Sequence, residues 1–470
     1  MISLECSRSG KTFNCRSRQQ DGYRLLFVCL VRCRDMENQD ITIIGETNYR
    51  NQRTRFGIKD HDRQRHIYVV GQTGMGKSTL LLNMLVQDIQ RGKGVALIDP
   101  HGDLAEQLLD YVPQRRMTDV IYINPADTEY PVGINLFDSN ETAGRHLIAS
   151  HLVDIFKKIW ADSWGPRLEY ILRNTILALL ECGGHTLLSI PRLLIDPGFR
   201  SMVLSKVQDP VVRTFWQVEY ELYPKVFRTE TISPIQNKVG QFLSVPVMRN
   251  ILGQANNKVN FRSAMDSGRI LIVNLSKGRL GEDNTSLLGS LIVSKLFLTA
   301  MSRSDTSPTD RKPFTVYIDE FQSFASDNFA QTLSEMRKFG LNLVLAHQYL
   351  AQLPLQLRSA VFGNVGTAIA FRIGAEDGEY LEREYWPTFR ATDLQSLSAY
   401  DIYVKLSIDG KTTDAFSART LPESTTNESC RDAMTQLSQL RYGKERSVVE
   451  ARIATWMTDP LHGQFEPKIG

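Results

Sequence analysis

The chain lacks low-complexity tracts, fixed-period repeats and a strong net charge. Its 470 residues are 42% hydrophobic and 23% charged, which is ordinary for a soluble globular protein and excludes a largely disordered chain. The net charge of +3 is unevenly placed, because residues 1–34 hold seven basic and two acidic residues, a net +5, and the remainder is therefore at −2. A protein that is basic throughout is excluded, so a polyanion would have to be held by a local patch or inside a pore.

Long apolar runs are lacking near the N-terminus. Leu25–Val31 is the continuous run there, whereas a membrane-spanning helix needs about 20 apolar residues. Arg32, Cys33 and Arg34 follow it, where a signal peptide would carry small residues. We expect no spanning helix and no signal peptide. A cytoplasmic location is predicted, with recruitment to the inner membrane by partners as the alternative.

Closely paired cysteines are lacking as well. Four of the six cysteines lie in the first 34 residues, without the C-x2-C spacing typical of a zinc site: Cys6, Cys15, Cys29 and Cys33. We interpret residues 1–35 as a basic, Cys-rich extension that is either non-native or mobile. A zinc site is the less favoured alternative.

The rest of the chain has the pattern of an α/β fold. Ile67–Val70 is typical of a buried strand, Thr79–Gln90 of an amphipathic helix, and Val95–Ile98 of the next strand. Strand, loop, helix and strand in this order open a parallel sheet. Further strands are predicted at Val120–Ile123, Ile270–Leu275, Phe314–Ile318, Leu343–Ala346 and Thr367–Phe371, and a hairpin at Ile402–Phe416 with its turn at Asp409-Gly410.

The α/β pattern is interrupted in the middle of the chain. A chain of this length is too long for one compact core, so a second domain or an insertion is expected. From Glu141 to about Phe261 the apolar residues recur at helical spacing, with few strand-like runs. We therefore predict a mainly parallel α/β sheet that is split by an all-helical insertion domain. The predicted division is 36–140 for the first part of the core, 141–262 for the insertion, 263–420 for the second part of the core and 421–470 for a polar tail.

A glycine-rich loop follows the first predicted strand. Gly71–Ser78 reads G-x-x-x-x-G-K-S, in which glycines let backbone N–H groups face phosphates and the following helix adds its positive dipole end. Lys77 would reach the β- and γ-phosphates, and the Ser78 hydroxyl would bind Mg²⁺. The residues predicted to bind the nucleotide are Gly71, Gln72, Thr73, Gly74, Met75, Gly76, Lys77, Ser78 and Thr79.

Two carboxylates end a later strand. Phe314–Glu320 is an apolar run ending in Asp319 and Glu320, at the strand end where parallel sheets bind ligands. Asp319 would hold Mg²⁺ through water, and Glu320 would act as general base on the attacking water. The Asn-Lys runs at Asn237 and Asn257 lack the Asp of a guanine-binding Asn-Lys-x-Asp motif, which favours ATP over GTP.

The neighbouring strand supplies two further candidates. Gln348 lies at its end and is predicted to sense the γ-phosphate, with a loop-capping amide as the alternative. Arg337 precedes the strand and could serve a neighbouring nucleotide as an arginine finger, with a surface residue at a helix end as the alternative. A basic run near the N-terminus is either a solvated face or a track for phosphates: Arg50, Arg53, Arg55, Lys59, Arg63 and Arg65.

Taken in order, five motifs resemble those of the HerA/FtsK superfamily of pumping ATPases, and within it the conjugative coupling proteins of type IV secretion. They are Gly71–Ser78, Asp99–Asp103, Ile318–Gln322, Arg337–Gly340 and His347-Gln348. The resemblance covers roughly residues 67–420 and includes a helical insertion where coupling proteins carry an all-alpha domain. It departs from them in having no membrane-spanning helices.

The resemblance implies a RecA-like P-loop NTPase that forms a homo-hexameric ring, with DNA in the central pore and ATP and Mg²⁺ at subunit interfaces. It implies that Arg337 acts in trans, with Arg372 as the reserve candidate, and that Asn135 lies near the nucleotide-binding core. We expect an ATP-driven DNA translocase, with a secretion channel, relaxase or nuclease as partner. The alternatives are a secretion-assembly ATPase that acts on protein cargo and a nucleotide-gated platform that recruits a nuclease or relaxase.

Overall fold

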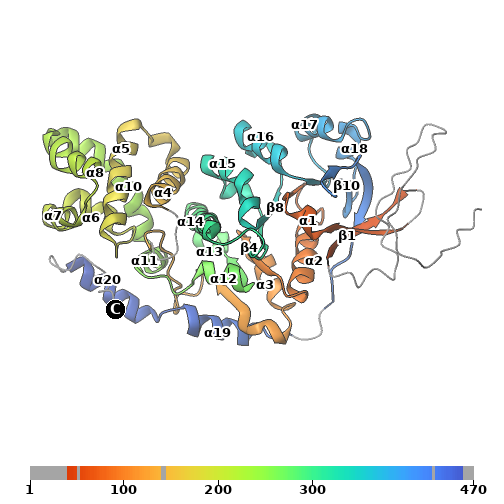
Figure 1. Cartoon of the computed structure of the whole chain (residues 1–470), viewed down its shortest axis with the longest axis horizontal. Coiled ribbons are helices and arrows are strands. Elements are labelled where there is room, and N and C mark those ends of the chain that lie inside the picture. The colour runs from red at the N-terminus through yellow and green to blue at the C-terminus, as the bar shows by residue number, and fades with distance from the viewer. Residues whose placement is uncertain (1–39, 50–52, 139–143, 426–428, 459–470) are drawn as a thin grey trace, which may run out of the picture.

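The computed structural model describes residues 40–49, 53–138, 144–425 and 429–458 (Figure 1). The Cys-rich extension predicted for residues 1–35, with its zinc alternative, lies outside these ranges.

A single large sheet of 11 strands forms the centre of the described part of the chain. Its parallel strands carry continuous apolar runs because both of their faces are covered. In spatial order they are β9 (Thr367–Ala370), β3 (Ile67–Val70), β8 (Leu341–His347), β7 (Phe314–Ile318), β4 (Gly94–Asp99), β6 (Ile270–Asn274) and β5 (Val120–Ile123). The predicted α/β class with a mainly parallel sheet is confirmed.

Antiparallel strands extend the sheet beyond β9. Their order is β10 (Asp401–Lys405), β13 (Phe416–Thr420), β1 (Ile41–Thr47) and β2 (Arg55–Lys59). Strands β1 and β2 were not predicted, and four short strands were predicted as one hairpin. The Asp409-Gly410 turn lies where it was predicted, but it joins the two-residue strands β11 (Ser407–Ile408) and β12 (Lys411–Thr412), which form a separate small sheet.

Helices cover both faces of the parallel strands and make a three-layer fold. Buried side chains of α14 (Glu282–Ser302), α15 (Asp327–Met336) and α16 (Leu355–Asn364) share one core with one face. Those of α2 (Lys77–Gln90), α3 (Asp103–Leu109) and α19 (Arg431–Tyr442) share the second core with the other face. The short helices α1 (Asp60–Arg63), α13 (Lys277–Leu280) and α18 (Ala391–Gln395) lie in the connections, as does the longer α17 (Ala375–Tyr385).

Between β5 and β6 the chain forms a block of helices at one end of the molecule (Figure 1). We call this the helical block. It contains α4 (Arg145–Ile159), α5 (Pro166–Cys182), α6 (Ser189–Ile195), α7 (Pro197–Lys206), α8 (Pro210–Thr214), a π-helical turn (Phe215–Glu219), α9 (Tyr220–Leu222), α10 (Lys225–Ser244) and α11 (Pro246–Leu252). The next helix, α12 (Phe261–Ser267), packs against α14 and β4 in the centre of the molecule.

The segment after Leu421, expected only as a polar tail, contains two helices. In α19, the Ser438 hydroxyl accepts a hydrogen bond of 2.8 Å from the backbone N–H of Tyr122 in β5. The next helix, α20 (Arg446–Thr458), packs against α11 of the helical block. The two helices therefore run along the molecule and connect the sheet with the helical block (Figure 1).

One stretch of the described chain, Glu282–Asp305, is long and apolar enough to cross a membrane. It comprises α14, and 83% of its apolar window is buried inside the fold. Such burial is what a core helix presents.

Candidate nucleotide-binding site

The glycine-rich loop joins β3 to α2, as the motif predicts. Gly74 and Gly76 have φ angles of +78° and +110°, a backbone conformation that residues other than glycine rarely adopt. A Cβ at Gly76 would also lie 2.7 Å from the Tyr400 ring, so only glycine fits there. The loop can therefore curl tightly and bring the N-terminus of α2, with its free N–H groups, to an anion.

The Lys77 side chain folds back over this loop. Its Nζ donates hydrogen bonds to the carbonyl groups of Gly71 at 2.6 Å and Gln72 at 3.1 Å. Burial lowers the pKa of Lys77, and the nearby Glu320 and Asp319 carboxylates oppose this shift. The amine is thus held at the mouth of the loop, between the loop carbonyls and the two acids.

Asp319 directly follows β7, which pairs with β4 and β8 in the middle of the parallel strands. Burial, the Glu320 charge and the Asp99 charge together raise its pKa from 3.8 to about 7. The positive charge of Lys77 opposes this shift. Asp319 and the exposed Ser78 hydroxyl offer the oxygen atoms that Mg²⁺ prefers, so the residues present fit this ion.

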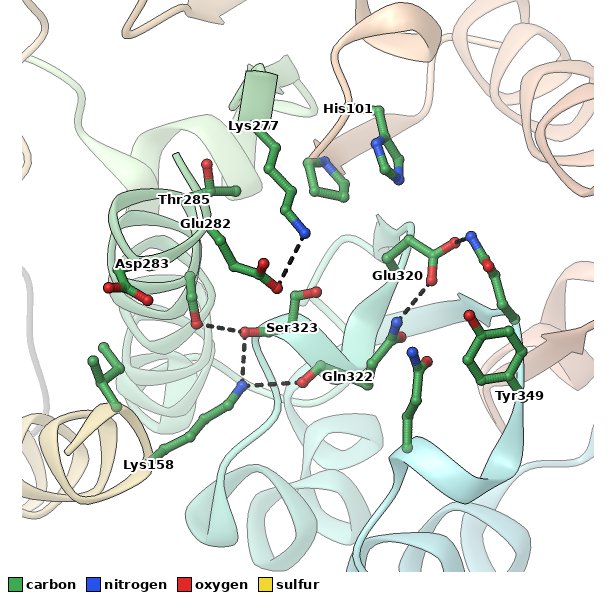
Figure 2. A pocket seen from close by; sticks show the side chains of 15 residues that line it. His101, Lys158, Lys277, Glu282, Asp283, Thr285, Glu320, Gln322, Ser323 and Tyr349 are labelled. Atoms are coloured by element: carbon green, nitrogen blue, oxygen red, sulfur yellow. Dashed lines mark hydrogen bonds and ion pairs between the residues drawn. The ribbon is translucent and has the colours of Figure 1, made fainter. Parts of the chain in front are cut away.

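Glu320 is held between two amide groups. Its Oε1 accepts a hydrogen bond of 2.7 Å from Gln348 Nε2, and its Oε2 accepts one of 2.7 Å from Gln322 Nε2 (Figure 2). The residue is 7% exposed and has a φ of +46°, an uncommon conformation for a residue with a side chain. Glu320 and Gln348 come together because β7 and β8 are adjacent parallel strands that end at one edge of the sheet.

Gln322 is a site residue to which sequence analysis gave no role. It belongs to the Ile318–Gln322 motif, but its position two residues after Glu320 does not by itself reveal a contact. The contact exists because the backbone turns sharply at Glu320 and continues as a 3-10 turn, Phe321–Ser323. Gln322 Oε1 is buried and has no hydrogen-bond partner among the described residues.

Arg337 lies away from the other predicted site residues of its own chain. It is exposed and sits before β8, whereas Gln348 follows β8. The seven residues of β8 lie between them, which is about 20 Å of extended chain. Arg372, the reserve candidate, lies instead beside its own loop, where its Nε donates a hydrogen bond of 3.2 Å to Gln72 Oε1.

Two further residues that the resemblance singles out, Asp99 and Asn135, have structural contacts. The Asp99 carboxylate accepts hydrogen bonds of 2.9 Å from the backbone N–H groups of His101 and Ala105, and so fixes the start of α3. The buried Asn135 side chain donates to the carbonyl groups of His185 and Ala255, at 2.9 and 2.7 Å. Asn135 therefore connects the strand region to the helical block.

The basic run does not form a continuous exposed track in the described residues. Arg63 is buried and makes a two-pronged ion pair with Asp88, at 2.6 and 2.8 Å. Lys59 Nζ lies 2.7 Å from Asp409 Oδ1, and Arg65 donates to the Gly410 carbonyl at 2.8 Å. These side chains hold α1 and β2 against the rest of the fold, so the interpretation of the whole run as a phosphate track is wrong. Arg50 lies outside the described residues.

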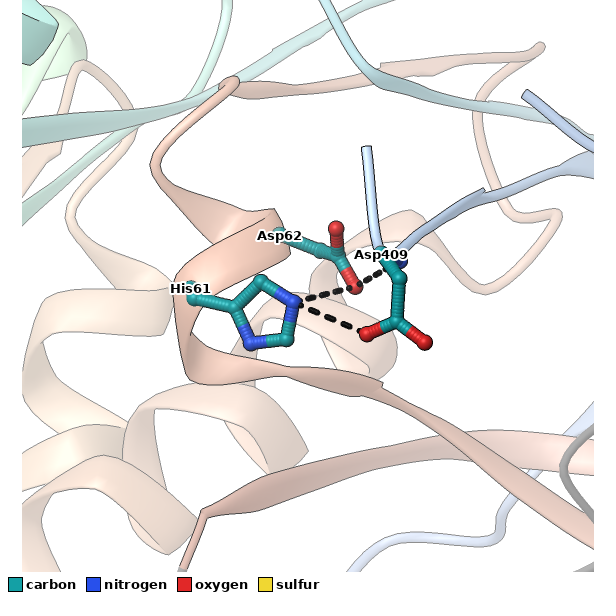
Figure 3. Close-up of side chains that lie close together, drawn as sticks. All are labelled: His61, Asp62 and Asp409. Carbon is teal, nitrogen blue, oxygen red and sulfur yellow. Dashed lines mark hydrogen bonds and ion pairs between the residues drawn. The ribbon is translucent and has the colours of Figure 1, made fainter. Parts of the chain in front are cut away.

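His61, Asp62 and Asp409 form a small cluster beside these contacts (Figure 3). His61 Nε2 lies 3.1 Å from Asp409 Oδ1 and 3.4 Å from Asp62 Oδ2. Both Asp62 oxygens accept backbone N–H groups of the 409–410 turn at 3.0 Å. Together with the ion pair between Lys59 and Asp409, these contacts attach α1 to the β11–β12 turn, which gives the cluster a structural role.

A cavity of about 550 Å³ opens beside Glu320, between the sheet edge and the helical block (Figure 2). Glu320 and Gln348 line it from the sheet, Lys158 lines it from α4, and Lys277 and Glu282, which form an ion pair of 3.0 Å, line it from α13 and α14. The proposed catalytic edge therefore faces the helical block directly.

Comparisons with known proteins agree with this architecture. The family model described as the central domain of the HerA helicase matches residues 44–296. Among solved structures, the plasmid coupling protein TrwB in complex with the GTP analogue GDPNP aligns with a TM-score of 0.59 and 16% identity, over 79% of this chain and 89% of that chain. VirB4 of Thermoanaerobacter pseudethanolicus aligns with a TM-score of 0.51 and 12% identity, over 81% and 96%. The comparison with curated proteins gives no match.

The sheet order and the glycine-rich loop define the P-loop NTPase fold, which the structures of TrwB and VirB4 share. The chain belongs to the family of the HerA helicase central domain, whose model spans more than half of it. The predicted resemblance to HerA/FtsK ATPases is confirmed.

Proposed function

We propose that this protein is an ATP-hydrolysing ring motor that moves DNA. The observation that carries the proposal is the meeting, at one sheet edge, of the Lys77 loop with a Glu320 carboxylate fixed by two amides. Membership of a helicase family supports DNA as the cargo. A TrwB structure was solved with ADP and Mg²⁺ and aligns with a TM-score of 0.55 at 16% identity. The shared fold can therefore accommodate these two ligands, which supports the proposal that this protein binds a nucleotide with Mg²⁺.

Each residue then has a defined task. Backbone N–H groups of residues 71–79 would bind the phosphates, and Lys77 would exchange its loop carbonyls for phosphate oxygens, which are stronger partners for an ammonium group. Ser78 and Asp319 would hold Mg²⁺, which neutralises charge on the phosphates when bound. Glu320 would accept the proton of the attacking water, and Gln348 would orient Glu320 and report on the γ-phosphate.

The test is the steady-state ATPase rate with and without single- and double-stranded DNA. Lys77→Ala and Glu320→Gln should each lower kcat by roughly 100-fold or more, since each removes a group that acts on the transferred phosphoryl group. Glu335→Gln, the same type of change on an exposed site in α15, is the control and should hydrolyse ATP normally.

Stimulation by DNA in the wild type, lost in the two site variants, would support the motor. Hydrolysis that neither form of DNA stimulates would favour a motor acting on protein cargo. Full activity of Glu320→Gln would contradict the assignment of the base and favour a nucleotide-gated platform.

A further inference from the structure

A lysine of the helical block contacts the turn that follows Glu320. Lys158, in the last part of α4, donates hydrogen bonds to the Gln322 carbonyl at 3.0 Å and the Ser323 carbonyl at 2.7 Å (Figure 2). The Ser323 carbonyl also accepts a hydrogen bond of 2.9 Å from the Ser286 hydroxyl of α14. Two consecutive carbonyl groups of this turn are thus fixed from outside the strand that carries the site.

The same turn determines how Glu320 is oriented. Gln322 supplies the backbone carbonyl that Lys158 binds and the side-chain amide that binds Glu320 Oε2 at 2.7 Å. Glu320 itself has a φ of +46° and a ψ of +49°, a conformation that persists in a residue with a side chain only when its surroundings hold it. A movement of the turn would therefore shift one of the two hydrogen bonds that fix the carboxylate.

Docking of α4 does not depend on Lys158 alone. Asp154 Oδ2 accepts a hydrogen bond of 2.8 Å from the backbone N–H of Asn328, and the Asn328 amide donates to the Ser150 carbonyl at 3.1 Å. Lys157 also contacts this region, through an exposed ion pair of 3.2 Å with Asp327. Removing the Lys158 amine should therefore leave α4 in place, so that its effect on the turn can be measured separately.

We propose that Lys158 is a positioning residue for Glu320, acting through the Gln322 and Ser323 carbonyl groups and the Gln322 side chain. The inference rests on the proposed hydrolytic role of Glu320. It connects the helical block to the base through the turn at Gln322 and Ser323, so that a displacement of α4 changes the hydrolysis rate without touching the nucleotide. Cargo or a partner that binds the helical block would regulate hydrolysis by this contact.

The test compares Lys158→Met, which keeps most of the aliphatic stem, with Lys157→Met, its exposed neighbour on the same helix. Lys158→Met should lower kcat roughly tenfold, since a misplaced catalytic group loses rate steeply with distance. The KM for ATP, the affinity for a non-hydrolysable ATP analogue and the melting temperature should stay at their wild-type values. Lys157→Met should match the wild type in all four measurements.

A double-mutant cycle with Gln322→Leu separates positioning from general loosening of the fold. If Lys158 acts through Gln322, the double variant should be no slower than the slower single variant, because both changes break the same connection. Independent, multiplying losses of kcat would overturn the inference, as would wild-type kcat in Lys158→Met. These failures leave ATP hydrolysis by the wild type intact, whereas a wild type that does not hydrolyse ATP would overturn the proposed function and this inference together.

Discussion

Asp319 combines a proposed role in the site with a cost in stability. Its folded-state pKa of about 7 lies above its ordinary value of 3.8, so the folded protein binds more protons than the unfolded chain between these two values. Stability contributed by this group therefore falls as the pH rises from about 4 to 7, and the full penalty is present above pH 7.

Asp319→Asn should remove this penalty. At pH 8 we expect the free energy of unfolding to rise by about 1–3 kcal/mol, while Mg²⁺-dependent hydrolysis is lost. The gain should be clearly smaller at pH 5, because only part of the penalty that builds up between about pH 4 and pH 7 is present there. Urea unfolding at both pH values measures this, with the exposed Asp310→Asn as control. Equal gains at pH 5 and pH 8 would contradict the raised pKa.

Arg63 illustrates a residue whose charge suggests one role and whose burial gives another. Its guanidinium contacts Asp88 and the Tyr317 hydroxyl, at 2.6 to 2.8 Å, and all three side chains are at most 3% exposed. Arg63→Met should therefore destabilise the protein by about 3–5 kcal/mol, because the buried Asp88 would lose its two-pronged partner and keep only the Tyr317 hydroxyl and Lys93, which is 3.7 Å away. Thermal or urea unfolding checks this against the exposed Arg53→Met, and a loss below about 1 kcal/mol would contradict it.

At the residue scale the sequence predicted most of the site because its residues end adjacent strands. The loop after β3, the acids after β7 and Gln348 after β8 meet because those strands are parallel neighbours. The contact of the Gln322 amide with Glu320 depends on a left-handed backbone turn that no spacing rule contains, which is why Gln322 was missed. The burial of Arg63 was likewise hidden, since its partner Asp88 comes from a helix 25 residues away.

At the scale of elements, continuous apolar runs predicted the parallel strands, whereas elements with few buried apolar residues were not predicted. The strands β3, β5 and β7 match their predicted bounds. Both of their faces are buried, so each strand is a continuous run of mainly apolar residues whose ends are easy to recognise in the sequence. Strand β1 is only half-buried and ends near polar residues, so it reads as irregular chain. Helices α19 and α20 bury few side chains each, too few for a clear helical period.

One of those few contacts fixes α20 to the helical block. The Arg192 guanidinium lies over the rings of Phe199 and Trp456, 4.6 and 4.9 Å from their centres, and Arg192 donates to the Trp456 carbonyl at 2.7 Å. Trp456→Ala should cost about 3 kcal/mol and speed amide hydrogen exchange across Arg446–Thr458, because a large buried side chain of this helix is lost. The neighbouring Met457, 61% exposed, provides the control Met457→Ala. Unchanged exchange in Trp456→Ala would show that other contacts hold α20.

At the scale of the whole molecule, the proposed site lies where the parts of the chain meet. The edge that carries Glu320 faces the cavity shared with the helical block, and α19 and α20 connect the sheet and the same block on another side of the molecule (Figure 1). The helical block is therefore attached both beside the site, through Lys158, and away from it, through α20. Such an arrangement suits a motor in which cargo contacts and hydrolysis influence each other.

Arg337 is the residue whose proposed role requires more than one chain. Because β8 separates it from Gln348, it cannot reach the nucleotide of its own subunit and could act only on a neighbour's. Arg337→Ala should then lower kcat roughly 1000-fold, as loss of an arginine finger does, while Lys338→Ala beside it, also exposed, should be near normal.

Mixing Arg337→Ala with the equally inactive Lys77→Ala should restore hydrolysis. In a randomly mixed ring, roughly a quarter of the interfaces would pair an intact loop from the first variant with an intact Arg337 from the second, so the mixture should reach about that fraction of the wild-type rate. Full activity of Arg337→Ala alone would remove the residue from the site. A mixture that forms rings and stays inactive would mean that the two residues do not share a site, because each intact partner is then present at an interface without effect.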